Sequence, residues 1–182
     1  MPRPSDTKQR IQEVARELFA RQGVHRTSLQ EIADRLGITK PALYYHFASR
    51  DDLVRSIVQP VVDEEEAFLG EQEALAEVDA RALLERYFDF HYRHRAEMLL
   101  MIGELATLAD LGLIDRVLAW RSRLGALLYG PQPTLAQAAR AAIAFGGIQD
   151  CTIQFPDAPR DELRRAAVDG ACAALGIRTA GR

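Results

Sequence analysis

The stretch "TSLQEIADRLGITKPALYYHF", residues 27–47, decides the fold, because it predicts two short helices separated by a tight turn. Its start carries two overlapping pairs at capping-box spacing, Thr27 with Gln30 and Ser28 with Glu31. In such a box the first side chain accepts a backbone hydrogen bond three positions on, and the second side chain reaches back. Either pair can begin the first helix, and the sequence leaves the choice open.

Three residues mark the turn and the second helix. Gly37 suits a turn in which the backbone needs a positive φ. Thr39 is a good N-cap, and Pro41 lies in the first helical turn, where its missing N–H costs nothing. Two helices joined by a short turn with glycine form the helix-turn-helix arrangement, which is typical of DNA-binding proteins.

The second helix of this pair has an unusual outward face. Leu43 and Phe47, four residues apart, supply the side that faces the core. A short outward face edged with long hydrogen-bond donors suits entry into the major groove of DNA. The residues left outside are Lys40, Pro41, Ala42, Tyr44 and Tyr45.

Length and charge are consistent with two parts of different character. The 182 residues suffice for one full domain, or for a small domain joined to a medium one. Residues 1–55 hold 10 Lys and Arg against 7 Asp and Glu, a net of +3, whereas residues 56–182 hold 13 against 19, a net of −6. This difference favours a polyanion partner for the first part only. No apolar leader and no run of 18 apolar residues are present, so we expect a cytoplasmic protein with no membrane partner.

Nearly every segment has the periodicity of an amphipathic helix, and none shows the sustained alternation of a strand. We therefore expect an all-α chain of about nine helices, with an N-terminal three-helix helix-turn-helix domain, residues 1–55, and a C-terminal helical bundle, residues 56–182. Pro60 is expected to kink or interrupt the fourth helix near Gln59. Later helices are expected at about 79–95, within 96–108 and 112–130, and at 134–155 and 160–175.

Residues 8–57, with "GVHRTSLQEIADRLGITKPALYYHFASRDDL" at their centre, resemble the DNA-binding domain of the TetR family of bacterial transcriptional regulators. The resemblance implies a double-stranded DNA operator as a partner. It also implies a second, helical domain that binds a small-molecule effector and forms a homodimer. The residues it assigns to DNA contact are Thr27, Ser28, Thr39, Lys40, Pro41, Ala42, Tyr44, Tyr45, His46 and Arg50.

Several of these residues have a second interpretation. Tyr45 can pack its ring on neighbouring helices and leave only its hydroxyl in water. Thr27 can cap the second helix, which is compatible with phosphate contact because a helix N-terminus attracts anions. The resemblance implies phosphate contacts for Tyr44 and His46. Lys40, one of only two lysines in the chain, is expected to reach a base edge.

The effector pocket is predicted by residue type alone. Methionine and aromatic side chains adapt to apolar ligands, but at helical spacing they are also ordinary core residues, and both interpretations stay open. His91, His94 and Glu97 have the spacing of a metal-binding face, but no fourth ligand is evident, so we expect no metal and no other cofactor. The pocket candidates are Tyr87, Phe88, His91, Met98, Met101, Trp120, Phe145 and Gln149.

The functional hypothesis is a repressor that binds a palindromic operator as a homodimer and is released by a small apolar or amphipathic effector. Small residues around 138–147 and 167–174 allow helices to approach closely. They can serve the core of a single chain, but the resemblance to the TetR family implies a four-helix dimer interface. An enzyme is not expected, since the sequence contains no nucleophile with an adjacent base, phosphate loop or paired metal site. The alternative is a regulator that binds DNA without any effector.

Overall fold

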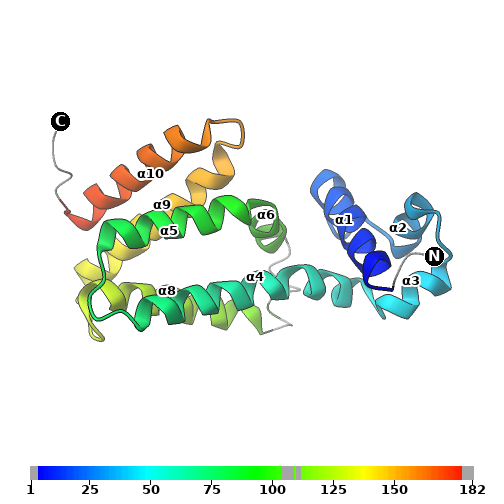
Figure 1. Cartoon of the computed structure of the whole chain (residues 1–182), viewed down its shortest axis with the longest axis horizontal. Helices are drawn as coiled ribbons and strands as arrows, with labels where there is room; N and C mark the ends of the chain where they lie inside the picture. Colours follow the sequence, from blue (N-terminus) through cyan, green and yellow to red (C-terminus); the bar gives the residue numbers. More distant parts are fainter. Residues whose placement is uncertain (1–3, 104–108, 110–111, 178–182) are drawn as a thin grey trace. The chain divides into compact units, whose positions relative to one another are not determined.

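The computed structural model describes residues 4–103, 109 and 112–177 (Figure 1). These residues form nine helices and no strand, which confirms the all-α prediction. The chain divides into two compact units, one of Met1–Asp63 with Ala96–Leu113 and the other of Glu64–Arg95 with Ile114–Arg182. Each unit is described by itself below.

The first unit is built around three helices, α1 (Pro4–Gln22), α2 (Leu29–Leu36) and α3 (Lys40–His46), of which the last two are short. Helix α1 packs on α2, and α2 packs on α3. The unit also contains the first part of α4 (Arg50–Glu73) and nearly all of α6 (Arg95–Gly103). The described side chains at its centre are apolar and at most 9% exposed, and they include Ile11, Ala15, Leu18, Phe19, Val24, Leu29, Ile32, Ala33, Leu43, Phe47, Leu53, Val54 and Ile57.

Helix α4 continues through Pro60, so the predicted interruption near Gln59 is wrong. A proline inside a helix removes one backbone hydrogen bond and costs about 3 kcal/mol. Residues on both sides of Pro60 are buried, among them Val58 and Val61. Burying such side chains stabilises a helix by about 1.5–3 kcal/mol each, which offsets the lost bond.

The second unit contains α5 (Ala80–Arg93), α8 (Leu113–Tyr129), α9 (Leu135–Gln154) and α10 (Arg160–Leu175). Helices α5, α9 and α10 pack on one another, as Figure 1 shows. Their buried residues join those of the last part of α4 and of α8 in one apolar cluster. The helix expected within 96–108 is observed as α6, and residues 104–108 lie outside the described part of the chain.

Candidate functional site

The start of α2 decides between the two candidate caps. The hydroxyl of Ser28 accepts a hydrogen bond from the backbone N–H of Glu31 at 3.1 Å, so Ser28 is the N-cap. Thr27 is only 2% exposed, and its hydroxyl donates to the carbonyl of Gly23 at 2.9 Å. The Thr27 side chain thus holds the segment after α1, and its neighbour Ser28 is exposed; the DNA contact of Thr27 stays a prediction.

The turn between α2 and α3 depends on glycine. Gly37 has φ 67°, in the left-handed region that side chains disfavour. Its N–H donates to the carbonyl of Asp34 at 3.1 Å, and the next N–H, of Ile38, donates to that of Ala33 at 3.0 Å. These bonds satisfy the last carbonyls of α2 and direct the chain into α3.

Helix α3 has one buried face and one exposed face. Leu43 is fully buried and Phe47, its C-cap, is 1% exposed, as the sequence predicted. Tyr45 is 83% exposed and Tyr44 44%, so Tyr45 does not pack on the neighbouring helices. Thr39 caps the helix by accepting a hydrogen bond from the N–H of Ala42 at 3.3 Å. The residues on or beside the exposed face are Thr39, Lys40, Pro41, Ala42, Tyr44 and Tyr45, with His46 half-buried at the end.

Two pairs of side chains interact along this exposed face. The Nζ atom of Lys40 lies 5.7 Å from the ring centroid of Tyr44, within the range of a cation–π interaction. The rings of Tyr45 and His46 meet edge to face with centroids 5.2 Å apart. The aromatic side chains therefore hold their charged or polar neighbours in defined places on α3.

Arg50 contacts the segment between α1 and α2, and its DNA contact stays a prediction. Its Nη1 donates to the carbonyls of Val24 and His25, at 3.4 and 3.3 Å, in the segment between α1 and α2. Its Nε is buried and has no hydrogen bond within the described residues. The guanidinium thus positions the entry to α2, a contact over 25 residues of sequence that local patterns do not reveal.

A family model described as "Bacterial regulatory proteins, tetR family" matches residues 11–57, which contain this helix pair. Residues 11–57 therefore belong to the TetR family of bacterial regulatory proteins. Two transcriptional regulators are similar to this chain over part of its length. The transcriptional activator FasR of Mycolicibacterium smegmatis is 38% identical over 81 residues, which are 42% of this chain and 36% of that protein. The transcriptional regulator AcrR of Shigella flexneri is 48% identical over 52 residues, 29% of this chain and 24% of that protein.

The match therefore spans about a third or less of these relatives' own length. A solved structure, that of Mycobacterium smegmatis AmtR, extends the likeness to 93% of this chain and 86% of its own, with a TM-score of 0.75 at 23% identity. At this identity the likeness shows a shared fold alone. The sequence relatives are named as a transcriptional activator and a transcriptional regulator, in agreement with the expectation that the chain is not an enzyme.

Four of the eight effector-pocket candidates meet in the core of the second unit. The ring of Tyr87 stacks on that of Trp120 with centroids 5.5 Å apart. It also contacts the ring of Phe145 at 5.0 Å and the imidazole of His91 at 4.2 Å. We call these four residues the Tyr87 cluster. Phe88 is also buried and belongs to the same core, and its ring stacks on that of Tyr92 at 5.6 Å.

The Tyr87 cluster contains buried polar atoms that have no hydrogen-bond partner among the described residues. The hydroxyl of Tyr87 and both ring nitrogens of His91 are buried and have no hydrogen bond among the residues described. Burial lowers the pKa of His91 to about 3, so the imidazole is neutral at physiological pH. A buried polar group without a hydrogen bond lowers the stability of the fold by about 1–3 kcal/mol. A ligand or an ordered water that bonds to these atoms would remove that cost.

The other pocket candidates are not all in this cluster. Met98 and Met101 are buried in the first unit, so the structure does not bring all eight residues into one compact body. Gln149 is half-buried, and its side-chain oxygen accepts a hydrogen bond from Nη2 of Arg121 at 2.6 Å. Helical periodicity predicts that a residue is buried, but it does not predict which unit's core contains it. The sequence therefore does not separate the two methionines from the aromatic residues of the second unit.

The three residues with metal-like spacing have separate surroundings. His91 lies in the Tyr87 cluster, Nε2 of His94 lies 3.0 Å from a carboxylate oxygen of Glu64, and Glu97 pairs with Arg16. Within the part of the chain that the structure describes, no group of three His, Cys, Asp or Glu side chains could hold a metal ion. The described helices also include none that is long and apolar enough to cross a bilayer.

Glu65 is a buried charge that sequence reasoning missed. Its side chain is in α4, only 5% exposed, and burial raises its pKa to about 7, although Arg121 and Arg116 oppose the rise. The backbone carbonyl of Glu65 accepts a hydrogen bond from Nε1 of Trp120 at 3.0 Å, so it adjoins the Tyr87 cluster. It stands in a run of three glutamates, 64–66, and nothing in that run shows which one is buried.

Proposed function

We propose that this TetR-family chain is a ligand-responsive transcriptional repressor of the cytoplasm. It binds a near-palindromic DNA operator as a homodimer and is released when a small apolar or amphipathic molecule binds. Residues 1–55 form its DNA-binding domain and residues 56–182 its effector and dimerisation domain. The observation that carries the proposal is the exposed face of α3, held outward by the fully buried Leu43.

This face is suited to the major groove of DNA. It offers the ammonium of Lys40 and the hydroxyls of Tyr44 and Tyr45 on a helix narrow enough to enter the groove. Lys40 reads a base edge, while the tyrosines, His46 and the cap region of α2 at Ser28 meet phosphates. The net charge of +3 in residues 1–55 supports binding to a polyanion.

The homodimer is proposed to form through α9 and α10. Ile143 of α9 is 64% exposed, and the small residues Ala142 and Gly147 beside it are exposed as well. An exposed apolar side chain next to small residues allows two helices to pack closely. The variant Ile143→Glu should therefore be monomeric at micromolar concentration in sedimentation velocity, where the unchanged chain is a dimer. A dimeric variant would place the interface elsewhere.

The effector is proposed to bind at the Tyr87 cluster. An apolar ligand body suits the rings of Trp120 and Phe145, and one polar group on it would satisfy the hydroxyl of Tyr87 or a nitrogen of His91. A ligand acts on DNA affinity only if it binds one conformation of the protein better than another. Effector response therefore requires a change of conformation on binding.

The deciding experiment selects operators from a pool of random duplexes with the full chain. We expect enrichment of near-palindromes with half-sites about one helical turn or more apart. The variant Tyr45→Ala should enrich weakly, whereas Glu77→Ala, at an exposed position outside α3, α9 and α10, should behave as the unchanged chain. Failure to enrich any sequence at low salt would refute specific DNA binding. A selected operator then serves to screen compounds for release.

A further inference from the structure

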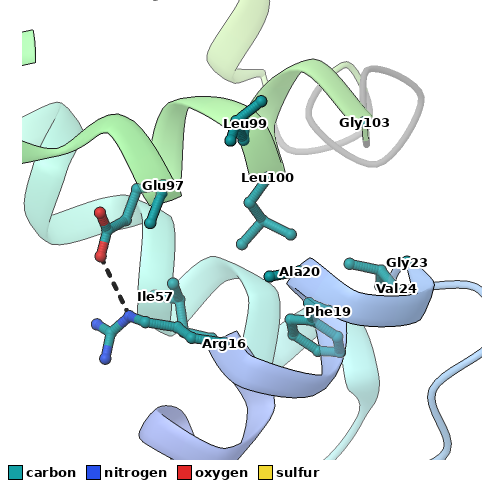
Figure 2. A pocket seen from close by; sticks show the side chains of 11 residues that line it. Arg16, Phe19, Ala20, Gly23, Val24, Ile57, Glu97, Leu99, Leu100 and Gly103 are labelled. Carbon is teal, nitrogen blue, oxygen red and sulfur yellow. Dashed lines mark ion pairs between the residues drawn. The ribbon is translucent and has the colours of Figure 1, made fainter. Parts of the chain in front are cut away.

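A cavity of about 340 Å³ lies between α1 and α6 in the first unit (Figure 2). Its walls are mainly apolar. Phe19 and Val24 from the α1 side and Ile57 of α4 are at most 5% exposed, and Leu99 and Leu100 of α6 complete it. Figure 2 shows Leu100 pointing from α6 towards α1. The volume is within the range of small-molecule sites, and no residue of the Tyr87 cluster contributes to it.

One end of this cavity carries a charge pair. The Nε atom of Arg16 lies 3.2 Å from a carboxylate oxygen of Glu97, as the dashed line in Figure 2 marks. This Nε is buried and makes no hydrogen bond within the described chain, so its N–H is not directed at the carboxylate. The two charges cancel, but one strong donor is left unused.

The chemistry of the walls selects the kind of molecule that fits. A charged ligand would lose its hydration on entering this apolar site. The ion pair of Arg16 and Glu97 has no net charge, so it would not compensate for that loss. A hydrocarbon would fill the space but would leave the buried Nε–H of Arg16 without a partner. An uncharged molecule with one acceptor oxygen avoids both costs.

We propose that the cavity between α1 and α6 binds a small, uncharged, largely apolar molecule that carries a ketone or hydroxyl oxygen. The apolar part lies against Phe19, Val24, Ile57 and Leu99, and the oxygen accepts a hydrogen bond from Nε of Arg16. This is a second site, additional to the effector site proposed at the Tyr87 cluster. Because α1 packs on α2, its ligand would contact the helix that supports the DNA-binding pair.

The test uses the full chain and three probes of the same shape, cyclohexanone, cyclohexylammonium and cyclohexanecarboxylate. We expect cyclohexanone to shift the methyl NMR signals of Val24, Ile57 and Leu99 in a saturable way, and neither charged probe to do so. The variant Ala96→Leu places a larger side chain in the cavity wall and should abolish the shifts. The matched control Ala136→Leu, on the exposed surface of α9, should bind cyclohexanone as the unchanged chain does.

A second comparison tests the hydrogen bond. The double variant Arg16→Met with Glu97→Met removes the donor without leaving an unpaired charge and without adding another donor. We expect its affinity for cyclohexanone to fall about tenfold and its affinity for benzene to stay the same.

Several results would overturn the proposal. They are an absence of saturable shifts with cyclohexanone, equal binding of a charged probe, unchanged binding in Ala96→Leu, or an unchanged affinity in the double variant. No DNA or effector is used, so such a failure would leave the proposed repressor untouched. Conversely, binding of cyclohexanone would support the cavity even in a chain that selects no operator.

Discussion

Replacing Glu65 with glutamine tests whether its carboxyl is as isolated from water as the structure shows. The pKa of this group rises from 4.5 to about 7 on folding, mainly because burial disfavours the charged form. The folded chain thus holds the proton more tightly than the unfolded chain. The contribution of Glu65 to the free energy of unfolding is therefore highest below pH 4.5 and falls as the pH rises through 7.

The size of this fall follows from the two pKa values. One pKa unit corresponds to about 1.4 kcal/mol, so the difference between 4.5 and about 7 corresponds to about 3 kcal/mol. Glutamine has nearly the same shape and no charge at any pH. We therefore expect the difference in free energy of unfolding, Glu65→Gln minus the unchanged chain, to increase by about 3 kcal/mol from pH 4 to pH 8.

Urea denaturation of both proteins at several pH values measures this difference. Other titrating groups are common to both chains, so their contributions cancel when the two curves are subtracted. The control Glu77→Gln, at an exposed position, should follow the unchanged chain at every pH. If Glu65→Gln also ran parallel to the unchanged chain, Glu65 would be hydrated and the burial argument would be refuted.

Three further substitutions test the helix pair. Lys40→Ala should cost about 1–3 kcal/mol on the preferred operator and relax the preference at one base position per half-site, which affinities for single-base operator variants would measure. Arg50→Ala should lower the free energy of unfolding by about 1 kcal/mol because two backbone carbonyls lose their donor, while base preferences stay unchanged; altered preferences would count against this positioning role. Gly37→Ala should cost about 1–2 kcal/mol since φ is 67° there, whereas Gly70→Ala, inside α4 with open space around it, should stabilise the chain in the same urea titration.

The helix pair was predictable because its signals are local. Leu43 and Phe47 were expected to be buried from their spacing, and both are. The choice between Thr27 and Ser28 was not predictable, since adjacent hydroxyls have the same capping chemistry and tertiary burial of Thr27 decides it. At Pro60 the local signal was misleading. Proline disfavours the interior of a helix, but burial of the side chains around it keeps α4 continuous.

The candidate sites depend on contacts that sequence patterns do not contain. The guanidinium of Arg50 reaches carbonyls 25 and 26 residues away, and Arg16 meets Glu97 across 81 positions. The cavity between α1 and α6 exists only once those helices are brought together, so no motif marks it. The aromatic residues of the Tyr87 cluster are predictable from the sequence, but only the fold shows that their buried polar atoms have no hydrogen bond among the described residues.

The position of Lys40 over the ring of Tyr44 affects how the DNA specificity of such a protein can change in evolution. The ammonium is confined before any partner arrives, so part of the entropy of ordering a long side chain is lost in the free protein. A substitution at Tyr44 would release that lysine and alter which operators are distinguished. A lineage could thus acquire new target genes through a residue that touches no base, and alignments of the base-reading position alone would miss the event.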